Sequence, residues 1–149
     1  MKGRILWLTG NSGSGKTTLG SILRDKLNKD KNSAILLDGD EMRIAISETA
    51  GFSREDREEH NLRCARLAKV LQSQGFHVVI SVIAPFQETR DKIDDIINPI
   101  KICWIYVKRD LPIDVNKPYE IPRDPDMVID TDKLSVGESI NLIYNEVFK

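Results

Sequence analysis

The sequence predicts a three-layer α/β/α fold around a five-stranded, mostly parallel sheet. Two observations lead to this prediction. Short apolar segments of strand length alternate along the 149 residues with longer segments whose apolar residues recur at helical spacing. Parallel strands need crossover connections, and helices in those connections cover both faces of the sheet. The chain also contains no internal repeat, low-complexity tract or linker, so we expect a single domain over residues 1–149.

The first elements are predicted from uninterrupted apolar runs and from the spacing of leucines. Residues 4–9 are predicted to form a buried strand, because the uninterrupted apolar run of residues 5–8 lies within them and a glycine-rich stretch follows. Residues 17–28 carry leucine and isoleucine at helical spacing, and residues 34–37 form a second apolar strand. Ser53 is a predicted N-cap for a helix over residues 53–73, because acidic residues follow it directly.

The second half continues the alternation after Gly75, which we expect to close the long helix. The segment 110–125 carries four prolines and little periodicity, so it is predicted to be a loop. The other elements predicted here are strands at 78–83, 102–107 and 127–130 and helices at 87–97 and 135–148.

Composition and charge favour a small-molecule partner. The formal net charge of −1 offers no basic excess for a nucleic-acid backbone, so no nucleic-acid partner is expected. The apolar run near the N-terminus is too short for a signal-peptide core or a membrane span, so we expect a cytoplasmic protein without a membrane partner. Cys64 and Cys103 match no metal-ligand spacing and are interpreted as buried free thiols.

A phosphate-binding motif lies between the first strand and the first helix. Its glycines let the backbone bring N–H groups close to phosphate oxygens, and the following helix N-terminus favours an anion. Lys16 is expected to bridge the terminal phosphates, and the Thr17 hydroxyl to ligate Mg²⁺. The motif matches the P-loop pattern in full, and we expect ATP to bind at Gly10, Asn11, Ser12, Gly13, Ser14, Gly15, Lys16, Thr17 and Thr18. A chance glycine-rich turn is the competing interpretation. The strand-to-helix context disfavours it, so the predicted fold is that of a P-loop NTPase.

Two carboxylates follow the second strand, in the sequence Asp38-Gly39-Asp40. In open α/β sheets this edge binds ligands, so one carboxylate can hold Mg²⁺ through water while the other accepts a proton from an attacking hydroxyl. A solvated turn with Gly39 at a positive dihedral is the alternative interpretation.

Several motifs together resemble the adenylylsulfate kinase family. The motifs cover most of the chain and are far more specific in combination than the phosphate-binding motif alone. They are Trp7-Leu8-Thr9-Gly10 with the residues up to Thr18, Leu37-Asp38-Gly39-Asp40 with Arg43, Gly51-Phe52-Ser53 with Glu55, Asp56, Arg57 and Glu59, then Ala68-Lys69, Gln74-Gly75, Pro85-Phe86, Arg90, Pro118-Tyr119-Glu120 and Asp130-Thr131.

The resemblance implies a kinase that transfers a phosphoryl group from ATP to the ribose 3′-hydroxyl of adenosine 5′-phosphosulfate. It implies that Asp40 is the Mg²⁺-associated catalytic carboxylate and that Lys16 acts with it on the transferring phosphoryl group. Arg43 and Arg57 would bind the anionic part of the acceptor, and Phe52 would stack on its base. The acceptor-binding set expected from the resemblance is Asp38, Arg43, Phe52, Arg57, His60 and Ile83. Relatives in this family are commonly dimers, so a homodimer is the assembly to test.

Three departures from the family lie on the acceptor side. His60 stands where the family has an asparagine, and Asn61 beside it would supply an amide after a one-residue shift. Ala84 stands where some members have a serine that can be phosphorylated, a change that should not stop turnover. The lid segment before Pro118 is shortened, and the cations left to replace it are Lys108, Arg109 and Lys117, which can equally be solvated loop charges.

These departures leave other functions open. The acceptor can be a cytidine diphosphate conjugate, such as cytidine diphosphoramidate, or another small molecule with a hydroxyl group. A function from a different class is a catalytically reduced nucleotide-binding regulatory module, which the Asp38/Asp40 pair and Arg43 disfavour because a switch needs no acceptor pocket.

Overall fold

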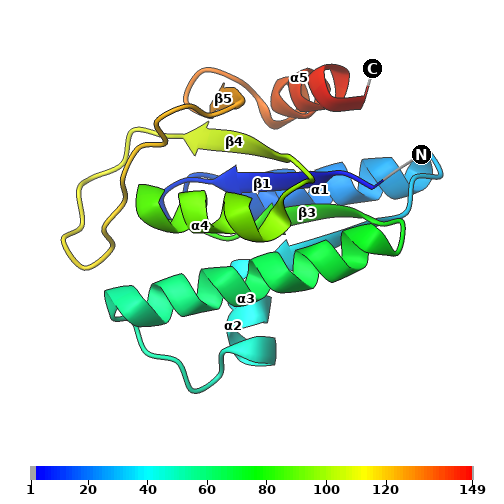
Figure 1. Ribbon diagram of the computed structural model, residues 1–149. Helices are drawn as coiled ribbons and strands as arrows, with labels where there is room; N and C mark the ends of the chain where they lie inside the picture. The colour runs from blue at the N-terminus through cyan, green and yellow to red at the C-terminus, as the bar shows by residue number, and fades with distance from the viewer. Residues whose placement is uncertain (1–2, 149) are drawn as a thin grey trace.

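This computed structural model describes residues 3–148 of the chain, which contain five strands and five helices joined by loops (Figure 1). Residues 1, 2 and 149 of the predicted domain lie outside the described residues. The elements in chain order are β1 (Ile5–Thr9), α1 (Lys16–Lys29), β2 (Ala34–Asp38), α2 (Gly39–Ile46), α3 (Arg54–Ser73), β3 (His77–Ser81), α4 (Gln87–Ile97), β4 (Ile102–Lys108), β5 (Met127–Asp130) and α5 (Val136–Phe148).

The sheet has the strand order β2-β3-β1-β4-β5, and every neighbouring pair is parallel. The predicted five-stranded sheet is thus confirmed, and it is parallel throughout. All strands end at one edge, where the connections after β1, β2, β3 and β4 lie (Figure 1). That edge is where open parallel sheets bind ligands.

Alternate residues of β1 divide the core into two halves. Ile5 and Trp7 pack in a cluster with buried residues of α3 and α4, whereas Leu6 and Leu8 pack with buried residues of α1 and α5. A strand buried on both faces reads as a continuous apolar run, which is why β1 has no polar alternation. The helices cover both faces of the sheet, as the predicted three-layer fold requires.

Most predicted bounds agree with the structure, and Ser53 caps α3 by accepting a hydrogen bond from the Asp56 amide at 3.1 Å. The sequence analysis predicted no helix over residues 39–46, where the structure has α2, and the alternative turn with Gly39 at a positive dihedral is not found. β3 is also shorter than predicted, since it ends at Ser81 and residues 82–85 leave the sheet. Residues 109–126, called the connecting loop below, contain no helix or strand, in agreement with the prediction. Within residues 3–148, no helix combines the length and apolar character needed to span a membrane.

Candidate active site

A cavity of about 1290 Å³ lies at the carboxyl ends of the strands. Pockets for single small ligands are usually about 300–1,000 Å³, so this volume fits two substrates held side by side. The lining comes from the loop before α1, the start of α2, the N-terminal half of α3, the segment after β3 and the connecting loop. Its residues are Ser12, Gly13, Gly15, Lys16, Thr17, Thr18, Asp38, Gly39, Asp40, Arg43, Ile44, Phe52, Arg57, His60, Asn61, Ser81, Val82, Ile83, Ala84, Pro85, Arg109, Asn116 and Lys117.

The phosphate loop, residues 10–17, turns tightly at its glycines. Gly15 has a φ of 106°, a left-handed conformation that side chains disfavour. A Cβ at Gly10 would meet the Val107 carbonyl oxygen at 2.3 Å, so only glycine fits against β4 there. The loop then runs directly into α1, whose first N–H groups have no helical partner and are free to bind an anion.

Lys16 is buried beneath this loop, with a relative exposure of 7%. Its ammonium Nζ donates to the carbonyl oxygens of Gly10 and Asn11, each at 2.8 Å. Burial lowers the pKa of Lys16 to about 8, against the opposing effect of the Asp38 and Asp40 carboxylates. The ammonium is therefore held at the phosphate loop and stays mostly charged at pH 7.

Thr17 and the two carboxylates form the polar centre of the cavity. The Thr17 hydroxyl donates to Asp38 Oδ1 at 2.7 Å. This contact places the Asp38 carboxylate beside Thr17, the residue expected to ligate Mg²⁺. Asp40 lies in the first turn of α2 and lines the cavity. The hydroxyl and carboxylate oxygens are the hard donors that Mg²⁺ prefers.

These oxygens fit a cation that the nucleotide helps to hold. Among the described residues, no group of three or more His, Cys, Asp or Glu side chains could by itself bind a metal ion. Mg²⁺ is usually bound through one or two carboxylates together with substrate phosphates, so a small protein donor set beside a phosphate loop is the expected arrangement.

At the opposite end of the cavity two arginines surround Phe52. The Arg43 guanidinium lies 4.4 Å from the centroid of the Phe52 ring, and that of Arg57 lies 5.6 Å away. Arg43 donates to the carbonyl oxygens of Ala50 and Gly51, and Arg57 donates to that of Phe52 at 2.8 Å. Each guanidinium has five N–H donors, so both retain donors for an anionic ligand.

His60 and Asn61, adjacent on α3, both line the cavity. His60 Nδ1 is 2.7 Å from the Ser47 hydroxyl. Burial and the nearby Arg43 and Arg63 charges lower the pKa of His60 to about 4, so its imidazole is neutral at pH 7. Asn61 is only 3% exposed, and its Nδ2 has no hydrogen-bond partner among the described residues. A buried unpaired donor costs about 1–3 kcal/mol, which a ligand that accepts a hydrogen bond would recover.

The connecting loop supplies the remaining side of the cavity. Arg109 Nη1 donates to the Gly13 carbonyl oxygen at 3.1 Å, and Asn116 and Lys117 line the cavity. Arg57 Nη2 donates to the Asn116 carbonyl oxygen at 3.2 Å. Of the three predicted replacement cations, Arg109 and Lys117 reach the cavity, while Lys108 is outside its lining.

The structure brings together every residue predicted to bind the acceptor, since all six line the cavity. Of the predicted ATP-binding residues, Gly10, Asn11 and Ser14 belong to the phosphate loop without lining the cavity. The sequence analysis did not assign a site role to Ile44, Ser81, Val82, Pro85 or Asn116. The only signal for them was their closeness in sequence to predicted site residues or to the shortened lid.

Comparisons with known proteins agree on one family. The family model described as adenylylsulphate kinase matches residues 2–117. The adenylyl-sulfate kinase of Geotalea uraniireducens is 35% identical over an alignment that covers 93% of this chain and 77% of the relative. The probable adenylyl-sulfate kinase of Aeropyrum pernix is 33% identical, with 98% of this chain and 93% of the relative covered.

A solved structure of a relative shows the same fold. The Mycobacterium tuberculosis APS kinase CysC in complex with AMPPNP and APS superposes on this chain with a TM-score of 0.90. The two are 26% identical, and the match covers 99% of both chains.

Proposed function

Because this chain belongs to the adenylylsulphate kinase family, we propose that it transfers the γ-phosphoryl group of ATP to the ribose 3′-hydroxyl of adenosine 5′-phosphosulfate. Family membership makes the chain a kinase with an alcohol group as acceptor. The observation that supports this acceptor best is one continuous cavity that joins the phosphate loop to Phe52 and its two arginines.

In the proposed reaction the acceptor's 3′-oxygen attacks the γ-phosphorus of ATP and forms the new O–P bond. The bond from the γ-phosphorus to the β,γ-bridging oxygen breaks, and ADP leaves. Asp40 orients the hydroxyl and accepts its proton, while the Lys16 ammonium neutralises the charge on the transferring group. Thr17, Asp38 and Asp40 are the residues that would hold Mg²⁺, which screens the phosphate charge when it is bound.

The aromatic and cationic side chains at the far end would seat the acceptor. Phe52 is 70% exposed in the free protein and offers its ring to a nucleobase. Arg43 and Arg57 present guanidinium groups to the phosphosulfate. The resemblance also implied a homodimer, and that assembly stays a prediction.

A cytidine diphosphate conjugate is a second candidate acceptor, favoured by one specific observation. Both His60, as a neutral imidazole, and Asn61, as an unpaired amide, line the acceptor end of the cavity. The unpaired amide of Asn61 can donate to the carbonyl oxygen of a cytosine base, an acceptor that adenine does not have.

ADP release with Mg²⁺ and ATP against a panel of acceptors tests the proposal. The panel contains adenosine 5′-phosphosulfate, cytidine diphosphate conjugates, plain nucleotides and simple alcohols. We expect the phosphosulfate to give the highest kcat/KM. Stimulation by a cytidine conjugate alone would replace it with the second candidate, and release that needs no acceptor would contradict both.

Replacing Asn61 with leucine tests the acceptor end of the cavity. Leucine has a similar shape and no donor, so the acceptor KM should rise about 5–20-fold if Asn61 donates a hydrogen bond to the acceptor. Stability should be unchanged or improved, because the variant removes a buried unpaired group. The KM for ATP is the internal control. An unchanged acceptor KM would show that the amide does not contact the acceptor.

A further inference from the structure

The segment that forms one wall of the cavity is held in an unfavourable backbone conformation. We call residues 83–85 the acceptor wall, since all three line the cavity where the acceptor is proposed to bind. Ala84, at its centre, is fully buried and has a φ of 47°. A non-glycine residue in this region costs about 1–3 kcal/mol and persists only where its surroundings impose it.

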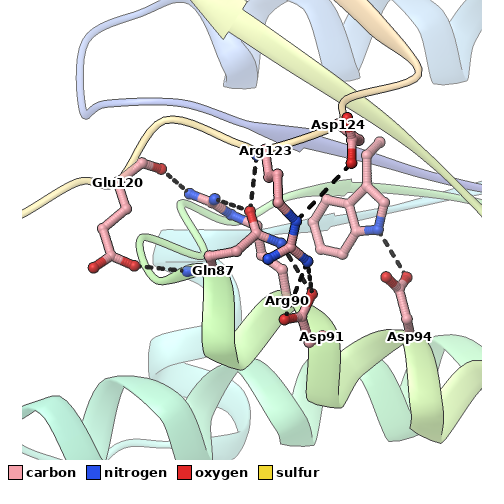
Figure 2. A network of polar contacts seen from close by, with 8 residues as sticks. Gln87, Arg90, Asp91, Asp94, Glu120, Arg123 and Asp124 are labelled. Atoms are coloured by element: carbon pink, nitrogen blue, oxygen red, sulfur yellow. Dashed lines mark hydrogen bonds and ion pairs between the residues drawn. The ribbon is translucent and has the colours of Figure 1, made fainter.

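Arg90, from the first turns of α4, supplies much of that constraint. It is 2% exposed, and its Nε donates to the Ala84 carbonyl oxygen at 2.8 Å. Its Nη1 donates to Gln87 Oε1 at 3.1 Å, and its Nη2 donates to the Glu120 carbonyl oxygen (Figure 2). The planar guanidinium thus connects the acceptor wall to the end of the connecting loop, a geometry that no other side chain reproduces.

The same end of the connecting loop is attached to the acceptor wall at further points. The backbone N–H of Glu120 donates to the Pro85 carbonyl oxygen at 2.7 Å. The backbone N–H of Gln87 donates to Glu120 Oε1 at 2.9 Å. The Tyr119 and Thr9 hydroxyls are 2.9 Å apart, and Thr9 also donates to the Ile83 carbonyl oxygen. The wall and residues 119–120 therefore form one hydrogen-bonded unit around Arg90.

This unit lies only a few residues from the part of the loop that reaches the cavity. Asn116 and Lys117 line the cavity just before Tyr119, and the Asn116 carbonyl accepts from Arg57. If residues 119–120 came loose from the wall, both the wall and these lining residues would lose their fixed positions.

We propose that Arg90 is a positioning residue for the acceptor: it locks the acceptor wall to Tyr119–Glu120 and so fixes two sides of the acceptor end of the cavity. It touches neither substrate, because it is outside the cavity lining. This inference rests on the proposed function, since it takes the far end of the cavity to be the acceptor site.

The chain offers a matched control in the same network. Arg123 forms an exposed ion pair with Asp91 at 3.3 Å, and its amide donates to Gln87 Oε1 (Figure 2). Neither Arg123 nor Asp91 lines the cavity or bonds to the acceptor wall. An exposed pair of this kind contributes little to stability, so Arg123→Gln should leave the kinetics unchanged.

The test compares Arg90→Lys, Tyr119→Phe and Arg123→Gln with the wild type. Arg90→Lys keeps the charge but loses the fork, and should raise the acceptor KM about 10–100-fold, since charged hydrogen bonds are lost. Tyr119→Phe removes one hydroxyl contact from a partly exposed side chain and should raise the acceptor KM about 2–10-fold without unfolding the chain. In both variants the KM for ATP should stay within about twofold, because in the described part of the chain neither Arg90 nor Tyr119 hydrogen-bonds to residues 10–17.

Hydrogen exchange gives a second readout for the same variants. Amides of residues 83, 84, 116, 117 and 119–121 should exchange faster in Arg90→Lys and Tyr119→Phe, but not in Arg123→Gln. Faster exchange with an unchanged acceptor KM would make Arg90 a purely structural residue and overturn the proposal. So would equal rises in both KM values. A wild type that turns over no acceptor in the panel would overturn the proposed function and this inference together.

Discussion

Asp40→Asn is expected to lower kcat by about 10²–10⁴-fold, the usual contribution of a positioned general base. Asp40 lines the cavity in the first turn of α2, close in sequence to Asp38 and Arg43, which line it too. Asparagine keeps the shape of the side chain but cannot accept the hydroxyl proton. The Kd for ATP should change by less than about tenfold, because Lys16, Thr17 and the phosphate-loop amides remain.

The measurement is kcat by ADP release together with the Kd for Mg²⁺-ATP by calorimetry. Glu41→Gln is the matched control, because Glu41 is the next residue of α2, is exposed and does not line the cavity. It should leave both quantities unchanged. Turnover by Asp40→Asn at the wild-type rate would remove the assigned role from this carboxylate.

Lys16→Ala is expected to lower kcat/KM for ATP by about 10³-fold or more, because it removes the cation that meets the transferring phosphoryl group. Lys16 is held by two carbonyl oxygens of the phosphate loop, at 2.8 Å each. The ammonium is therefore positioned before ATP binds and needs little reorganisation when the phosphate arrives. Loss of the Lys16 ammonium should lower kcat as well as raise the KM for ATP.

Thermal unfolding checks that the Lys16→Ala variant is folded. Burial of the ammonium lowers the pKa of Lys16, so this charge is unfavourable in the empty site and its removal should not destabilise the fold. Lys29→Ala, at the exposed end of the same helix, is the control and should behave as the wild type. A kcat/KM for ATP within about tenfold of wild type in Lys16→Ala would contradict the role given to this residue.

Local sequence patterns were sufficient to predict those parts of the fold and the site whose conformation is determined by a single segment of the sequence. The phosphate loop and α1 follow from the glycine pattern after an apolar strand, and α4 has the bounds predicted from its spacing. α2 could not be predicted in this way. It is eight residues long and begins with Gly39, and a helix this short depends on its tertiary packing, here through Met42.

The contacts of the connecting loop could not be predicted from the sequence pattern either. Asn116 reaches the cavity because its carbonyl accepts from Arg57 and because Tyr119 is held at Thr9, contacts between residues about 59 and 110 positions apart. His60 and Asn61 posed a different problem. From the resemblance, either His60 or Asn61 was expected to contact the acceptor. In the structure both line the cavity at the N-terminal half of α3.

In the proposed function, the phosphoryl group passes within this cavity from ATP to the ribose 3′-hydroxyl of an acceptor nucleotide. The most direct test is label transfer from γ-labelled ATP, with Mg²⁺, to adenosine 5′-phosphosulfate and to its 3′-deoxy analogue. We predict label at the 3′-position of the phosphosulfate and none on the analogue. Equal labelling of the two compounds, or ADP release at the same rate without either, would contradict the claim.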